Sequence, residues 1–251
     1  MAPPIRDLFL RPDSFFRDLS AGPDEYRIPL IIVGLCVVFD VVRQYFLVDF
    51  ISQVILKAIP VTPDMAAISG IMTGMFQAMI ILTVISSIPT FFAYWLIIAA
   101  VFYIVSSTYS KTGTIYKVLI ATGWGMLPFI AFNIAGAALV AVYRNSMSLT
   151  ISPEYYNQTV AGTESSQYSS AFAASPDISQ YITYNQPFIE FNQISFALFA
   201  AGLLCCCFFW IYAMKNTRSL TMKQSAITVV LPVMLFLAYM LVQKILNGWV
   251  G

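Results

Sequence analysis

Histidine is absent from all 251 residues of the chain. This absence removes the commonest general base, the usual zinc ligand and the Ser-His and Cys-His nucleophile pairs. The four cysteines are Cys36 and the run 205–207, which lie in apolar segments and lack the spacing of metal ligands. We therefore expect no catalytic residue, no metal and no cofactor, and we interpret the chain as a non-enzyme.

Charge is also scarce. Charged residues make up 10% of the chain, whereas a soluble domain carries roughly 25%. Thirteen basic and twelve acidic residues nearly cancel, so no overall field favours nucleic acid as a partner. Hydrophobic residues reach 59%, which is typical of an integral membrane protein.

Apolar runs of membrane-spanning length follow one another along the chain. A helix needs roughly 20 apolar residues to cross a bilayer, and four segments reach that length: 28–48, 118–142, 194–214 and 226–246. A fifth run, 68–106, measures about 58 Å as one helix. It is either two spans or one long helix kinked near Pro89, where Ser86 and Ser87 are placed to satisfy the carbonyl that proline frees.

The distribution of basic residues favours a single crossing by the 68–106 run. In that arrangement the cytoplasmic segments hold nine basic residues: Arg6, Arg11, Arg17, Arg27, Lys111, Lys117, Lys215, Arg218 and Lys223. The outer segments hold only Lys57, Arg144 and Lys244, which agrees with the positive-inside rule. The prediction is an all-α bundle of five transmembrane helices in the cell membrane, with the N-terminus cytoplasmic and the C-terminus outside.

The segments between spans carry their own signals. Within the cytoplasmic segment 1–27, a helix after Pro12 presents Phe15, Phe16 and Leu19 on one face, and we expect the phenylalanines to enter the lipid interface. Residues 49–59 form either a short amphipathic helix or a continuation of the first span.

The long polar loop at 143–193 lies outside in this topology. It contains one glycosylation sequon, at Asn157, which is either modified or left bare.

Three stretches together resemble a known family. They are "LFLRPDSFFRDLSAGPDEYRIPL" with its Pro-x-x-Phe-Phe element, the glycine-bearing turn "SKTGTIYKVLIATGWGMLP", and the polar turn "KNTRSLTMKQSA" before the last span. This order resembles the Yip-domain family of five-span membrane proteins related to the Ypt/Rab-GTPase-interacting proteins. The resemblance covers essentially the whole chain apart from the outer loop, and it implies that residues 28–251 form the membrane domain. The short N-terminal region resembles that of a bacterial or archaeal member.

The resemblance implies a role in membrane organisation or vesicle traffic. Its expected partners are membrane lipids and other membrane proteins, or a second copy of the chain. Eukaryotic members carry a long cytosolic N-terminal region, whereas 27 residues precede the first span here. We therefore do not extend the GTPase binding of the eukaryotic members to this chain.

Asp40 and Arg43 lie within the first span, three residues apart and so on one helix face. Ionisable side chains at bilayer depth suggest a functional site, here an ion or proton relay. The alternative is a self-neutralised structural pair, and we favour it because no other span contains a carboxylate.

Other intramembrane residues predict packing or hydrogen bonds between helices. Interhelical hydrogen bonds are expected from Gln77, Asn133 and Gln243, and the alternative is a substrate path lined by Asp40, Gln77 and Asn133. Close packing or a helix kink is expected at Gly70, Gly74, Pro89, Gly123, Gly125, Pro128, Gly136 and Pro232, with the third span at the centre of the bundle.

Three functions remain open. The favoured one is a non-catalytic scaffold or membrane-organising protein. The alternatives are a small transporter or channel that uses Asp40 and Arg43, and an accessory subunit of a larger membrane complex.

Overall fold

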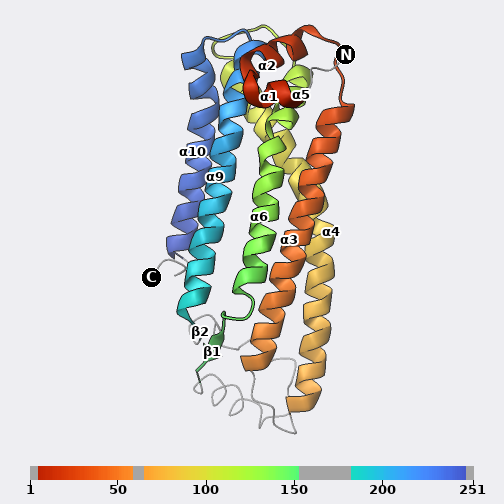
Figure 1. Cartoon of the computed structure of the whole chain (residues 1–251), viewed down its shortest axis with the longest axis vertical. Helices are drawn as coiled ribbons and strands as arrows, with labels where there is room; N and C mark the ends of the chain where they lie inside the picture. Colours follow the sequence, from red (N-terminus) through yellow and green to blue (C-terminus); the bar gives the residue numbers. More distant parts are fainter. Residues whose placement is uncertain (1–4, 59–64, 153–181, 247–251) are drawn as a thin grey trace.

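Long apolar helices make up most of the computed structural model, which describes residues 5–58, 65–152 and 182–246 (Figure 1). Within these described ranges, five helical segments are long and apolar enough to cross a membrane. The predicted all-α bundle of five spans is therefore confirmed. Residues 5–21, the connection at 107–114 and the turn at 218–221 lie at one end of the bundle, and two short strands, at 149–151 and 182–184, lie at the other.

The first span is helix α3, Arg27–Ala58. Pro29 is tolerated at its start because the first helical turn needs no donor from that residue. The helix continues through residues 49–58, so the second of the two alternatives for this segment is the observed one.

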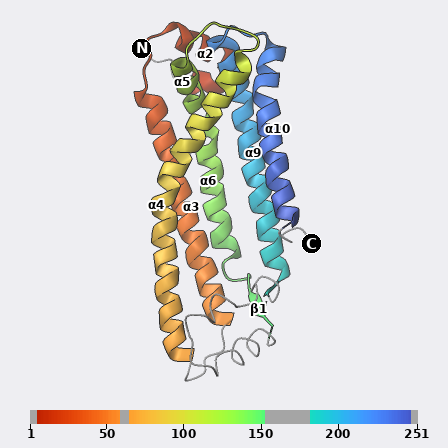
Figure 2. The ribbon, with the colours of Figure 1, turned by 180° about the vertical axis from the view of Figure 1, so that it is seen from behind.

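The second span is helix α4, Met65–Ser106, which runs unbroken past Pro89. Figure 2 shows that α4 changes direction partway along its length. The expected role of the serines is wrong: Ser86 and Ser87 donate to the carbonyls of Thr83 and Val84, and not to that of Ile85, which the proline frees. These hydroxyls bond back within their own helix, as serine commonly does in membrane helices.

The third span consists of two helices, α5 (Ile115–Gly125) and α6 (Leu127–Tyr143), joined at Met126. Pro128 stands in the first turn of α6, so it starts a helix here and does not kink one. Helices α5 and α6 contact α3, α4 and α9, which confirms the central place predicted for this span.

Two glycines of α5 allow this close packing. A Cβ at Gly123 would lie 2.9 Å from the Cβ of Pro29 on α3, and one at Gly125 would overlap the indole of Trp210 on α9. The same indole donates to the carbonyl of Thr122 at 2.9 Å. Only a residue without a side chain lets α9 approach α5 this closely.

The last two spans are helix α9, Gln186–Thr217, and helix α10, Met222–Leu246. Strands β1 (Leu149–Ile151) and β2 (Ile182–Tyr184) pair antiparallel before α9, a ribbon that the sequence did not predict. The amide of Asn185 caps α9 by accepting from the backbone of Phe188. The sequon at Asn157 lies outside the described residues.

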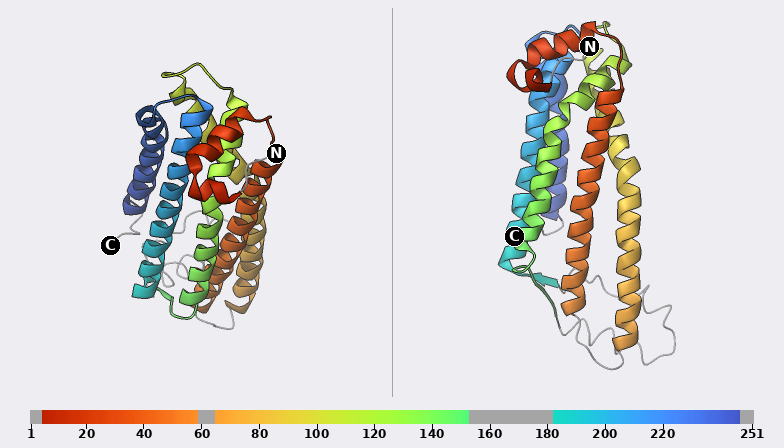
Figure 3. Two further views of the ribbon diagram at one scale, coloured as in Figure 1. Left: turned by 45° about the horizontal axis from the view of Figure 1, so that its top comes forward. Right: turned by 45° about the vertical axis from the view of Figure 1, so that its right-hand side comes forward.

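Helices α1 (Ile5–Leu10) and α2 (Pro12–Ala21) lie across the N-terminal end of the bundle (Figure 3). Phe15 and Phe16 are fully buried in the protein core, with Phe15 edge-on to Trp124 at 5.0 Å between ring centroids. The expectation that these phenylalanines enter lipid is therefore wrong. Apolar periodicity alone does not distinguish a face that packs on neighbouring helices from one that packs on lipid.

Polar contacts fasten α2 in this position. Lys215 donates to the carboxylate of Asp13 at 2.7 Å, and Asn216 donates to it at 3.0 Å. These two groups lower the pKa of the Asp13 carboxyl. The contact is therefore fully present above the ordinary pKa of an aspartate, and it is lost as the pH falls through the lowered value.

Replacing Gly125 by alanine tests the packing of α9 on α5. Because the added methyl group overlaps Trp210, we expect a loss of about 1–3 kcal/mol of stability, measured as thermal unfolding of the purified protein in detergent. Gly74→Ala is the control, since a Cβ there meets no described atom within 4 Å. Equal unfolding temperatures for the two variants would contradict the close approach.

Candidate functional site

An ion pair lies in the middle of helix α3. The Nη2 atom of Arg43 lies 2.7 Å from Oδ1 of Asp40, so the two residues form the pair that their spacing suggests. Asp40 is 9% exposed, and a quarter of the Arg43 side chain is accessible. The charges therefore neutralise each other within one helix, at a depth where an isolated charge is costly.

Helix α6 makes room for the arginine. A Cβ at Gly136 would lie 2.8 Å from Cδ of Arg43, so the side chain crosses the helix where α6 presents no side chain. Nearby, the amide of Asn133 donates to the carbonyl of Cys36 at 3.4 Å, which ties α6 to α3. The pair is thus held by both its own helix and its neighbour.

Asp40 and Arg43 line a cavity of about 680 Å³ between helices α3, α4, α6, α9 and α10. This volume lies in the range of small-molecule sites, and spaces between the helices of a bundle are a common place for them. Figure 2 shows that the part of α4 nearer to α5 tilts across the bundle toward α9 and α10. The cavity is consequently bounded by helices from both halves of the chain.

The α4 wall of the cavity carries hydroxyl groups at helical spacing. Thr83, Ser86, Ser87 and Thr90 all line it, and successive members of this set are three, one and three residues apart, which places them on one face of the helix. The hydroxyls of Ser86, Ser87 and Thr90 donate to carbonyls of their own helix, as in the 2.7 Å bond from Thr90 to the carbonyl of Ser86. Their oxygens therefore remain available as acceptors.

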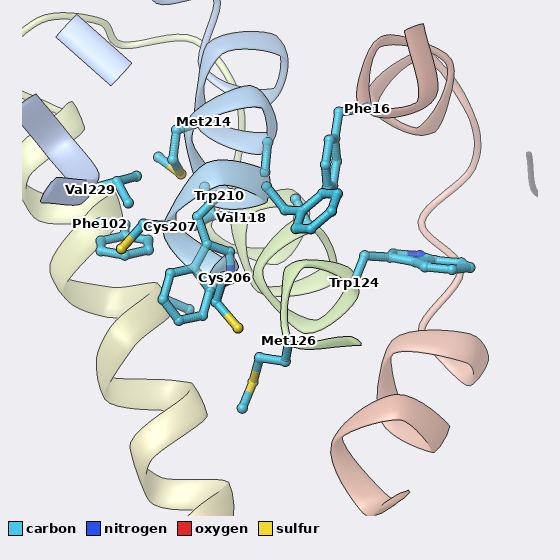
Figure 4. Packing of buried hydrophobic residues seen from close by; sticks show 14 of the residues in the cluster. Phe16, Phe102, Val118, Trp124, Met126, Cys206, Cys207, Trp210, Met214 and Val229 are labelled. Carbon is cyan, nitrogen blue, oxygen red and sulfur yellow. The ribbon is translucent and has the colours of Figure 1, made fainter. Parts of the chain in front are cut away.

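The opposite end of the cavity is apolar and buried. Figure 4 shows Phe102, Met126, Cys206 and Trp210 grouped where α4 and α9 meet the junction of α5 and α6. All four are buried, whereas Tyr94 and Ile97 at the α4 edge are half exposed. The cavity thus has a sealed apolar end and an open edge on the surface of the bundle.

The remaining predicted residues lie elsewhere. Gln77 is exposed on α4, and Gln243 is half-buried near the end of α10. Neither lines this cavity, and Asn133 does not line it either, so this cavity does not join Asp40 to Gln77 and Asn133. Pro232 lines the cavity from α10, and Gly70 lies in the part of α4 whose side-chain environment is not described.

A second buried arginine, Arg218, has a structural role that the sequence did not predict. It follows α9 and is 1% exposed, with no carboxylate beside it in the described part of the chain. Its five N–H groups are all donated to the end of α4 and the segment that joins it to α5: to the hydroxyls of Ser106 and Ser107 and to the carbonyls of Ser110, Thr112 and Gly113. The guanidinium also stands 4.5 Å from the ring centre of Tyr103.

Gly113 permits this arrangement. Its φ of +73° lies in the left-handed region that favours glycine, and a Cβ there would overlap the carbonyl of Thr217. The glycine in "SKTGT" was the available sequence signal, since a glycine in a short turn often marks a close backbone approach. Arg218 and Gly113 therefore fix the α4–α5 connection on the end of α9.

Comparison with known proteins identifies the family. Residues 6–243 match the family model described as the Yip1 domain. No curated protein and no solved structure matches the chain.

Replacing Arg218 by lysine tests the role of the guanidinium. Lysine keeps the charge but has three donors, so buried carbonyls lose their partners and we expect a loss on the order of 3 kcal/mol in thermal unfolding. Arg17→Lys is the matched control because Arg17 is exposed. Similar unfolding temperatures for both variants would mean that the hydrogen bonds are not needed.

Single and double substitutions of the ion pair test whether it is self-compensating. Asp40→Asn leaves a cation unpaired, and we expect a loss on the order of 3 kcal/mol in unfolding experiments in detergent. Asp40→Asn with Arg43→Gln removes both charges and is expected to recover most of that loss. A double variant that is as unstable as the sum of the two single variants would refute the pairing.

Proposed function

Because the chain belongs to the Yip1 domain family, we propose that it is a non-catalytic membrane-organising scaffold with its N-terminal end at the cytoplasmic surface. It is a multi-pass membrane protein of five apolar helices. In this proposal residues 1–27 form a cytoplasmic segment, and residues 28–251 form the membrane domain.

The main support for a membrane-organising role comes from helix α1. Ile5, Phe9 and Leu10 are exposed apolar residues at the N-terminal end of the bundle, next to the basic residues Arg6 and Arg11. Apolar side chains flanked by arginines are the composition of a helix that lies in the membrane interface. Leu8, on the other face of α1, is fully buried in the bundle, so the helix is attached to the spans and not loosely tethered.

The contacts of α2 and the α4–α5 connection make this end stiff. Phe16 of α2 is buried in the bundle core, Lys117 of α5 donates to the carbonyl of Ser20 at 2.6 Å, and Arg218 fixes the α4–α5 connection. Two extra helices thus widen the bundle at one end only. Insertion of α1 into one leaflet then supplies asymmetric area, which is how a membrane protein imposes curvature.

The orientation is supported by charge. The nine basic residues assigned to the cytoplasmic side fall at the end that holds α1, α2, the α4–α5 connection and the α9–α10 turn, or close to that end. An excess of lysine and arginine marks the cytoplasmic side of a membrane protein.

Transport is the second candidate function, because the cavity reaches Asp40 and Arg43 from the surface of the bundle. A polar pair that lines a cavity at membrane depth is the arrangement expected of a solute or proton path. The pair is internally neutralised, however, and Asp40 is the only carboxylate among the described residues that line the cavity.

Reconstitution into liposomes distinguishes the two functions. We expect vesicle diameters, measured by electron cryomicroscopy, to fall as the protein-to-lipid ratio rises, with no proton flux reported by a trapped pH-sensitive dye. The variant Ile5→Ser with Phe9→Ser and Leu10→Ser removes the apolar face of α1 and is expected to abolish the change in diameter. The control, Ile5→Leu with Phe9→Leu, keeps the apolar face and the effect.

Two results would count against the scaffold proposal. One is an unchanged size distribution at all protein densities. The other is a proton flux that disappears in the Asp40→Asn, Arg43→Gln double variant, which would establish transport.

A further inference from the structure

Arg43 has hydrogen-bonding capacity that the described residues do not use. One bond joins its Nη2 atom to Asp40, whereas a guanidinium carries five N–H donors. Its Nε atom is buried and has no partner among the described residues. At bilayer depth an unmet donor is costly, because hydrocarbon supplies no acceptor. An acceptor from outside the chain can reach only the accessible quarter of the Arg43 side chain, and it would bind there at the Nη donors.

The cavity beside Arg43 is shaped for a molecule with two chemically different ends. Asp40, Arg43 and Gln44 lie at one end together with the hydroxyls of α4, and aromatic and aliphatic side chains line the rest. A volume of about 680 Å³ accommodates a single hydrocarbon chain or a compact ring system, and it is small for a complete two-chain phospholipid. The occupant therefore has one small polar end and a long apolar body.

The charges at the polar end select against an ionic head group. Asp40 and Arg43 cancel each other, and no second basic residue lines the cavity in the described part of the chain. An anionic head would bring a net negative charge into a low-dielectric site, and a cationic head would compete with Arg43 for Asp40. A neutral carbonyl or hydroxyl oxygen accepts a hydrogen bond from the guanidinium without either cost.

The cavity has exposed wall residues on α4, within the membrane-spanning part of the bundle. Tyr94 and Ile97 line it and are half exposed on α4, while Phe102 and Trp210 seal the end nearer to α1 and α2. A ligand that enters between α4 and α10 arrives from the bilayer itself. Molecules dissolved in the hydrocarbon are therefore favoured over solutes from water.

We propose that this cavity binds a neutral membrane lipid, with its carbonyl or hydroxyl oxygen at Arg43 and its apolar body between α4, α9 and α10. The site is independent of the scaffold function proposed above, which depends on α1 at the N-terminal end. Arg43 acts as the donor, and Gly136 gives its side chain the room to reach the cavity wall.

Photolabelling in nanodiscs tests the proposal. The probe is a C16 alcohol with a diazirine on its chain, at a low mole fraction in phosphatidylcholine nanodiscs that contain the full chain, followed by mass spectrometry of the labelled peptides. We expect labels on the cavity-lining parts of α4, α9 and α10, and at least a tenfold loss of labelling when an excess of unlabelled C16 alcohol is added.

Two α4 variants provide the comparison. Thr90→Phe places a ring in the cavity and is expected to reduce labelling about tenfold, whereas Ile88→Phe, at an exposed position outside the cavity lining, is expected to leave it unchanged. Thermal unfolding of both variants confirms that they are folded. The vesicle diameters of the reconstitution experiment are expected to be the same for Thr90→Phe and the parent protein, which separates this site from the scaffold function.

The head group is tested separately. The Asp40→Asn, Arg43→Gln double variant replaces the guanidinium, and we expect weaker labelling by the C16 alcohol, while a C16 alkane probe labels both proteins equally. The C16 carboxylate is expected to label the parent protein less than the alcohol does at neutral pH. Labelling that is equal in Thr90→Phe and Ile88→Phe, spread evenly over lipid-facing helices, or stronger for the carboxylate would overturn the proposal.

Discussion

The arrangement of the N-terminal end depends on the complete hydrogen bonding of one buried cation, Arg218. A guanidinium without a carboxylate partner is tolerated in a protein interior only if its donors are all used. Here the backbone and hydroxyls of the α4–α5 connection use all five, and Gly113 lets that connection approach α9. The end of α9 therefore fixes the position of the start of α5. It thereby also fixes the surface on which α2 packs.

Arg43 shows the opposite condition at bilayer depth. It has a carboxylate partner, yet most of its donors are unused within the described residues, and it stands at the wall of a cavity. The two arginines illustrate how the same side chain serves structure when its donors are saturated and becomes a candidate binding group when they are not. Burial alone does not separate these cases; the count of satisfied donors does.

The sequence predicted the spans well because hydrocarbon thickness and apolar run length are directly linked. It also identified the central third span from Gly123 and Gly125, since small residues permit close helix contact. It placed Phe15 and Phe16 in lipid, which is wrong, because a lipid-facing and a core-facing phenylalanine look alike in a membrane protein. The cavity was not foreseen for a related reason: the hydroxyl face of α4 was visible at 83, 86, 87 and 90, but its partners on α9 and α10 are set by tertiary packing.

The contact between Gly125 and Trp210 joins α5 to α9. The Trp210 ring occupies the space that a side chain at position 125 would take, and its N–H is bonded to Thr122. The same ring, together with Phe102, closes the inner end of the cavity. A shift of α9 relative to α5 would therefore disturb both the buried end of the cavity and the Arg218 contacts, two turns farther along. The inner end of the cavity and the Arg218 contacts therefore both depend on the position of α9, while the two proposed functions use separate surfaces.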